Sequence, residues 1–147
     1  VGSEMCIRDS IAGASMGGYG ALVHAMKDTE QYRAVGAFSP ATVWAKDLEE
    51  KVGHKFPEPM DLYQIIRDDV DAGKKLPDIF FCVGNNDFLI ESVDRFEEYL
   101  NELKIDHRFD RVDGYEHEWR FWELELPEFL DWLPRTDSYA KMGKHKM

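Results

Sequence analysis

Short apolar runs alternate with helical patterns along the chain from Ile11 onward. This alternation is typical of βα units that pack on a parallel sheet. The predicted helices cover about 16–27, 41–51, 60–72, 92–103 and 118–133, and the predicted strands cover 34–40, 77–84 and a segment from His107. Only Ile11 and Ala12 are left to form a strand before the first helix. We therefore expect an α/β fold, with a mostly parallel sheet of about four strands and flanking helices.

Three of the predicted elements have features that say more about their place in the fold. The stretch PDIFFCVG, 77–84, is apolar on both faces, as a central parallel strand should be. The stretch HRFDRVDG, from His107, alternates less regularly and predicts a strand near a sheet edge. Pro127 lies within the last helical segment and marks either a new first turn or a kink.

Composition and charge restrict the class of partner. The 147 residues are 44% apolar, which is enough for a core, and the formal net charge is −11. Nucleic acid or an anionic membrane surface would repel such a charge, whereas a small neutral substrate remains possible. Cys6 and Cys82 cannot build a disulfide scaffold, and Cys82 lies in an apolar run that predicts a buried thiol. A reducing compartment, the cytoplasm, is therefore favoured.

The first candidate for chemistry is the stretch GASMG, 13–17. It fits the GxSxG pattern of a strand-to-helix turn that exposes a serine hydroxyl, here that of Ser15. Gly13 and Gly17 would let the neighbouring chain come close without a clashing Cβ. Glycine-rich turns that contain serine are common and mostly structural, so the pattern needs further support.

That support comes from two later strand ends. A serine nucleophile needs a base within hydrogen-bond reach and a carboxylate to orient the base. Asp87 follows the strand 77–84, and His117 follows the next predicted strand, so Ser15, Asp87 and His117 occur in the required order at the carboxyl edge of the sheet. Taken singly, Asp87 could belong to a plain turn, and His117 could cap a helix.

The other acids and histidines fit less well. Asp94 falls inside a predicted helix, and Asp110 and Asp113 lie within or near the last strand. His24 is a helix away from the turn, His54 is in a loop, His107 starts a strand and His145 is in the tail. The candidate triad is therefore Ser15, Asp87 and His117.

The stretches GASMGGYGA, CVGNNDFL and GYEHEWRFWELELPEFLDWL resemble the esterase D branch of the α/β-hydrolases, over Ile11 to about Pro134. The resemblance implies that Ser15 is the nucleophile, Asp87 the orienting acid and His117 the general base. It implies that the backbone N–H of Met16 supplies half of the oxyanion hole, and it implies no metal or cofactor. The reaction would be two-step hydrolysis of a small-molecule ester through an acyl-enzyme.

The substrate is less determined than the reaction. Tyr19 resembles the residue found in short-chain carboxylesterases and carbohydrate acetyl esterases, whereas S-formylglutathione hydrolases should have histidine there. The branch also includes feruloyl esterases and mycolyl transferases, so acyl transfer to another acceptor is an alternative. Trp44, Trp119 and Trp122 could line a substrate pocket, although core packing is an equally good interpretation.

The N-terminal segment does not fit the rest of the chain. A complete α/β-hydrolase has several strands before its nucleophile turn, so we expect this chain to be the C-terminal half of that fold. The loop that donates the second oxyanion N–H would then be missing, at a cost of about 3 kcal/mol, and the chain alone could be an inactive fragment. The stretch VGSEMCIRD resembles the translation of a transposon-end adapter used in sequencing libraries. We expect a non-native segment over 1–9, a partial hydrolase domain over 10–134 and a polar, basic tail over 135–147, while a genuine N-terminus is the alternative.

Overall fold

The computed structural model describes residues 9–42, residue 53 and residues 61–133. Ala41 and Thr42 are not helical, and the rest of the helix expected over 41–51 lies outside the described residues. So do Trp44, His54, His145, the tail after Pro134 and all but the last residue of the segment 1–9.

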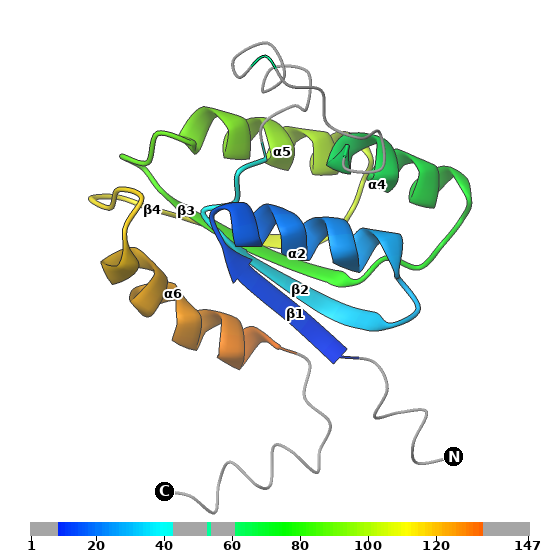
Figure 1. Cartoon of the computed structure of the whole chain (residues 1–147), viewed down its shortest axis with the longest axis horizontal. Coiled ribbons are helices and arrows are strands. Elements are labelled where there is room, and N and C mark those ends of the chain that lie inside the picture. The colour runs from blue at the N-terminus through cyan, green and yellow to red at the C-terminus, as the bar shows by residue number, and fades with distance from the viewer. Residues whose placement is uncertain (1–8, 43–52, 54–60, 134–147) are drawn as a thin grey trace, which may run out of the picture.

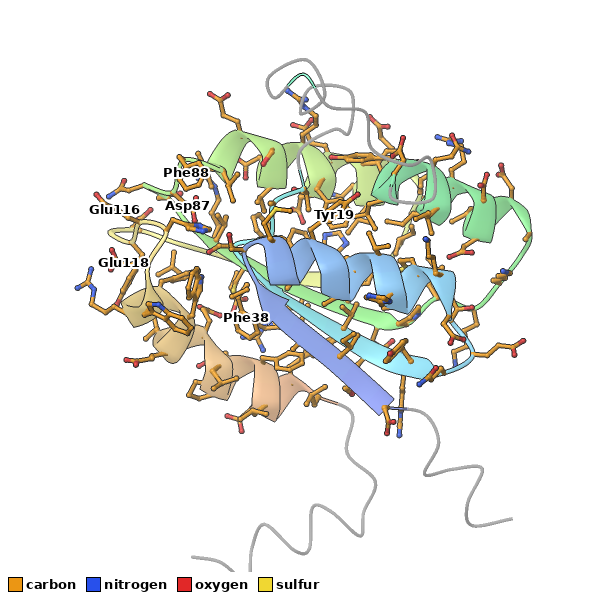
Figure 2. The ribbon with its side chains drawn as sticks, viewed as in Figure 1. Tyr19, Phe38, Asp87, Phe88, Glu116 and Glu118 are labelled. Atoms are coloured by element: carbon orange, nitrogen blue, oxygen red, sulfur yellow. The ribbon has the colours of Figure 1, made fainter. Side chains whose placement is uncertain are left out.

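Four parallel strands form one sheet, as the alternating pattern predicts. They are β1 (Asp9–Ala14), β2 (Tyr32–Phe38), β3 (Asp78–Gly84) and β4 (His107–Val112), and their order across the sheet is β1-β2-β3-β4. All four carboxyl ends therefore lie at one edge, on the side where Figure 2 labels Asp87. β3 is an inner strand that is buried from its second residue on, and β4 is an edge strand, so both predictions are confirmed.

The boundaries of β1 and β2 differ from the expected ones. β1 is longer than Ile11 and Ala12, because backbone pairing with β2 extends it from Asp9 to Ala14. β2 ends at Phe38 rather than continuing through Pro40. The reason is local: Ser39 has φ 46°, which takes the chain out of the extended conformation.

The helices cover the sheet unequally. α2 (Met16–Lys27), α4 (Leu62–Asp71) and α5 (Ile90–Glu102) lie over one face, and α6 (Trp119–Trp132) lies over the other (Figure 1). α4 begins where Asp61 caps it, because the Asp61 carboxylate accepts hydrogen bonds from two N–H groups of the first turn. α6 is one helix with Pro127 inside it, so Pro127 does not start a new helix.

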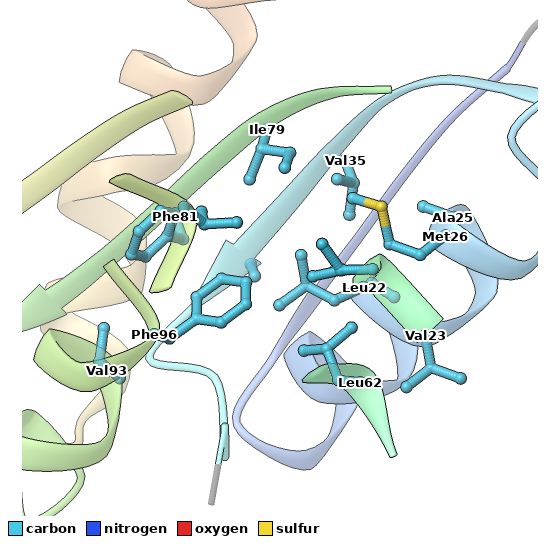
Figure 3. Close-up of a cluster of buried hydrophobic side chains, with 14 of the residues drawn as sticks. Leu22, Val23, Ala25, Met26, Val35, Leu62, Ile79, Phe81, Val93 and Phe96 are labelled. Carbon is cyan, nitrogen blue, oxygen red and sulfur yellow. The ribbon is translucent and has the colours of Figure 1, made fainter. Parts of the chain in front are cut away.

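The larger core fills the face under the three helices. Its buried side chains come from α2, α4, α5 and alternate positions of β2 and β3 (Figure 3). Phe81 points from β3 into this core, where its ring lies 5.3 Å from that of Phe96 on α5 and 4.5 Å from that of Phe109 on β4. Alternation along β3 therefore sends Phe81 to this face and its neighbours Phe80 and Cys82 to the other.

The smaller core lies between the sheet and α6. It consists of Phe38, Phe80, Cys82, Phe121 and Phe129, with partly buried aromatic residues around it. Phe129 approaches β2 closely at Gly36, where an added Cβ would come within 2.4 Å of its ring. The absence of a side chain at Gly36 thus allows α6 to sit close to the sheet.

Candidate active site

Ser15 occupies the single residue between β1 and α2, in a strained conformation. Its backbone has φ 56° and ψ −120°, a combination that an L-residue adopts only when its surroundings enforce it. Its N–H donates to the carbonyl of Phe38 at 2.8 Å, and its carbonyl accepts from the N–H of Ala41 at 3.1 Å. The end of β2 and the turn that follows it therefore hold the serine in place.

The glycines around Ser15 differ in how closely the neighbouring backbone approaches them. A Cβ at Gly13 would lie 2.2 Å from the carbonyl oxygen of Gly17, and a Cβ at Gly18 would lie 3.1 Å from the carbonyl oxygen of Gly13. A Cβ at Gly17 itself would meet nothing within 4 Å. Among the described residues around Ser15, the close approach therefore occurs at Gly13 and Gly18, and the role expected for Gly13 and Gly17 in a nucleophile turn stays a prediction.

Asp87 lies just beyond β3 and is almost fully buried. Its Oδ1 accepts the N–H of Leu89 at 2.8 Å, and its Oδ2 lies 2.8 Å from Nδ1 of His117. The turn interpretation applies and is compatible with the functional one, because the first oxygen fixes the turn and leaves the second one directed at the histidine.

His117 connects the acid to the serine. Its Nε2 lies 2.8 Å from Ser15 Oγ, and its side chain is 18% exposed. When Nδ1 carries the ring proton and donates a hydrogen bond to Asp87, Nε2 carries the lone pair and can accept the hydroxyl proton of Ser15. The structure thus brings together the three residues predicted from the strand ends.

Backbone contacts join the loop of Asp87 to the loop of His117. The N–H of Asn86 donates to the carbonyl of Tyr115 at 2.9 Å, and a Cβ at Gly84 would lie 2.2 Å from that same carbonyl oxygen. Sequence reasoning missed this role of Gly84, although a glycine at the end of a buried strand indicates a close backbone approach.

The rejected acids and histidines have other partners or positions. Asp94 pairs with Arg111, Asp110 pairs with Arg108, and Asp113 accepts a hydrogen bond from Asn85. His107 bonds to Glu97 and to the carbonyl of Ile105, and His24 is exposed on α2.

Aromatic rings surround the imidazole of His117. The ring of Phe88 lies 4.9 Å away, and the ring of Trp122 lies 5.2 Å away, edge to face. Phe88 is 77% exposed and Trp119 is 73% exposed, so core packing is the wrong interpretation for Trp119. Trp122 is half-buried: it packs against the smaller core, as one of its two interpretations expected, and its ring also lies beside His117.

Met16 is the first residue of α2, and its side chain is exposed. The first N–H groups of a helix have no acceptor within the helix and point out of its positive end. The Met16 N–H is therefore available for an oxyanion, and that role stays a prediction.

Two buried groups beneath α6 have shifted pKa values. Burial, together with the nearby Asp110 carboxylate, raises the pKa of Glu125 to about 8. Burial also raises the pKa of the Cys82 thiol well above its ordinary value, so Cys82 is a buried thiol, as predicted. In the part of the chain that the structure describes, no cluster of three or more His, Cys, Asp or Glu residues is suited to a metal ion. No helix within those same ranges has the length and apolar character to cross a membrane.

Comparison with known proteins decides the family. The profile of the family described as putative esterase matches residues 3–133. The chain belongs to this esterase family. Its fold is that of the α/β-hydrolases of the esterase D type.

The individual proteins that this chain resembles are distant from it in sequence. An acetyl esterase from Caldicellulosiruptor saccharolyticus is 25% identical, over 87% of this chain and 55% of its own length. The crystal structure of an S-formylglutathione hydrolase from Agrobacterium tumefaciens is 26% identical, with a TM-score of 0.68 over 86% of this chain and 48% of that one. A fluorophosphonate-binding serine hydrolase from Staphylococcus aureus is 21% identical, with a TM-score of 0.72 over 84% of this chain and 52% of that one. The chain thus spans about half the length of these three proteins.

Proposed function

We propose that the chain carries the catalytic triad of a serine carboxylic-ester hydrolase, with Ser15 as nucleophile, His117 as general base and Asp87 as orienting acid. The observation that carries the proposal is the unbroken relay from Ser15 Oγ through both nitrogens of His117 to a buried carboxylate, each contact being 2.8 Å long. Membership of the esterase family supports the same reaction class.

The reaction would proceed in two steps. Ser15 Oγ attacks the ester carbonyl while His117 Nε2 takes its proton, and the backbone N–H of Met16 stabilises the oxyanion. The tetrahedral intermediate then expels the alcohol, which takes the proton from His117 and leaves an acyl-serine. A water molecule, deprotonated by His117, attacks this ester and releases the acid. Because His117 must be neutral to act as a base, ester hydrolysis should slow at acid pH.

The proposed substrate is a small ester with a short acyl group, such as an acetylated carbohydrate. The acetyl esterase among the relatives supports this choice. Hydrolysis of S-formylglutathione is the second candidate, supported by the relative from Agrobacterium tumefaciens. Transfer of the acyl group to a sugar or lipid acceptor is a third, and it would appear as a new ester formed in competition with water.

We further propose that this chain is the C-terminal half of a longer enzyme, whose N-terminal half supplies the second oxyanion N–H. The coverage of only 48–55% of these three relatives supports this division. Sequencing the locus from source DNA tests both this idea and the adapter origin of the segment 1–9. An upstream reading frame that continues into IAGASMGG supports both ideas, whereas native codons for MCIRD contradict the adapter origin. The cytoplasmic location stays a prediction from the cysteine content.

Covalent labelling tests the triad in the full-length protein. We expect a fluorophosphonate probe to label the wild type and not the Ser15→Ala variant. Asp87→Asn should lower kcat by about 10⁴-fold, because the histidine then holds the wrong tautomer. Asp94→Asn is the matched control and should keep full activity, since Asp94 is paired with Arg111 at the surface. A folded full-length wild-type protein that resists labelling would contradict the proposed triad and favour an inactive protein.

A further inference from the structure

We propose that Ser39 and Trp122 act together as positioning residues that hold the imidazole of His117 at the correct tilt toward Ser15. This inference rests on the proposed function and adds two residues to its machinery. It starts from a hydrogen bond between residues 83 positions apart: Trp122 Nε1 donates to Ser39 Oγ at 3.0 Å.

The tilt of the imidazole needs a separate support. The hydrogen bonds to Asp87 and Ser15 fix the two nitrogens of His117, but the ring can still rock about the line that joins them. Contacts with the ring faces and edges decide that rotation. Trp122 lies against the imidazole at an interplanar angle of 89°, and Phe88 lies against it at 60°.

Trp122 is the better anchored of the two rings. Phe88 is 77% exposed and follows Asp87 in a loop, whereas Trp122 is half-buried on α6 and bonded through its indole nitrogen. An indole held at its N–H has little freedom to turn within its site, so it presents a fixed edge to the imidazole.

Ser39 is itself held rigidly. It is fully buried, and its N–H donates to the carbonyl of Cys82 at 2.8 Å, which continues the pairing of β2 with β3 by one residue. Its φ of 46° is unusual for a residue with a side chain, and such a conformation persists where the surroundings over-determine it. This backbone directs the hydroxyl of Ser39 toward α6 rather than along the sheet.

The same turn also fixes the nucleophile. Phe38, directly before Ser39, accepts the N–H of Ser15, and Ala41, two residues after Ser39, donates to the carbonyl of Ser15. The turn after β2 therefore reaches Ser15 through its backbone and His117 through Trp122. This one turn therefore fixes the position of the Ser15 hydroxyl relative to the His117 imidazole.

The test is a double-mutant cycle in the full-length protein, with an uncharged short-chain ester as substrate. Trp122→Phe removes the N–H and keeps an aromatic ring, and Ser39→Ala removes the acceptor. Each should lower kcat by about tenfold to a hundredfold with little change in KM, because the base is misaligned while binding is intact. The double variant should lose no more than the worse single variant, since both remove the same interaction.

Trp132→Phe is the matched control, because Trp132 lies at the far end of α6 and packs on Phe80 and Phe129. It should keep the kcat of the wild type. Additive losses in the double variant, an unchanged kcat in Trp122→Phe, or an equal loss in Trp132→Phe would each overturn the inference.

A spectroscopic readout separates this inference from the proposed function. The NMR signals of the His117 imidazole should shift or broaden in Trp122→Phe and in Ser39→Ala, and stay unchanged in Trp132→Phe. Absence of hydrolysis that depends on Ser15 would refute the proposed function alone. Unchanged imidazole signals in Trp122→Phe would refute the positioning role, whether or not the protein hydrolyses the ester.

Discussion

The two faces of the sheet are built differently. One face is covered by α2, α4 and α5 over a large apolar core, and the other is covered by α6 over a small aromatic cluster (Figures 1 and 3). The face under α6 also carries buried polar groups, among them Ser39 and Glu125. The larger apolar core therefore lies on the three-helix face, while the α6 face carries Trp122, which approaches His117.

The largest expected effect sharpens this contrast. Phe81→Ala should destabilise the protein by about 3–5 kcal/mol, because Phe81 is fully buried between Phe96 and Phe109 and leaves a cavity. Phe129→Ala on the opposite face should cost about 1 kcal/mol less, because a single helix can settle into the space more readily. Urea unfolding of the full-length protein measures both. Equal losses would mean that α6 is held as rigidly as the three-helix layer.

The second prediction tests how α6 docks on the sheet. Gly36→Ala places a Cβ within 2.4 Å of the Phe129 ring and should cost about 1–3 kcal/mol, together with a fall in kcat as α6 and Trp122 shift. Gly20→Ala is the matched control: its Cβ meets nothing within 4 Å, and in the interior of α2 it should raise stability by up to about 1 kcal/mol. A loss of stability in Gly36→Ala without loss of activity would show that the site does not depend on how α6 docks.

The third prediction concerns the buried acid on the α6 face. Glu125 is 3% exposed and its Oε2 has no hydrogen-bond partner among the described residues. The groups that face it are Cys82 on β3, Asp110 and Arg108 on β4, and Glu128 on α6. Burial raises its pKa from an ordinary 4.5 to about 8, so between these values the folded state binds more protons than the unfolded state.

The contribution of Glu125 to stability is therefore present at low pH and is lost as the pH rises toward about 8. Glu125→Gln should remove this slope and be more stable than the wild type at alkaline pH by about 1–3 kcal/mol. Unfolding free energies of both proteins, measured across this range, check the result. A constant difference between them at every pH would contradict it.

The smallest expected effect lies on the three-helix side. Arg111 and Asp94 form an ion pair at 3.1 Å between β4 and α5, with side chains 46% and 39% exposed. Because water screens such a pair, Arg111→Gln should change the free energy of unfolding by no more than about 0.5 kcal/mol. A change of several kcal/mol would show that this exposed pair matters more than the buried polar groups under α6.

The candidate triad could be predicted because each of its residues follows a predicted strand, although only the strand before Asp87 has a strong apolar pattern. Ser15 and Asp87 stand just past the ends of β1 and β3, and His117 lies in the loop after β4, and parallel strands bring such ends to one edge. A GxSxG pattern, in contrast, does not reveal which glycine faces its neighbour. Which glycine comes close depends on how α2 leaves the sheet, and in this structure Gly13 and Gly18 do so.

The sequence by itself determined the order of the described strands and helices, the position of the candidate triad residues and the esterase resemblance, because each follows from patterns among residues close together in the chain. The tertiary structure decided what lies beside His117. The hydrogen bond from Trp122 to Ser39 joins α6 to the turn after β2, and it exists only because α6 docks on the face opposite the other three helices. Contacts between segments so far apart depend on packing across the whole sheet, and no local pattern encodes them.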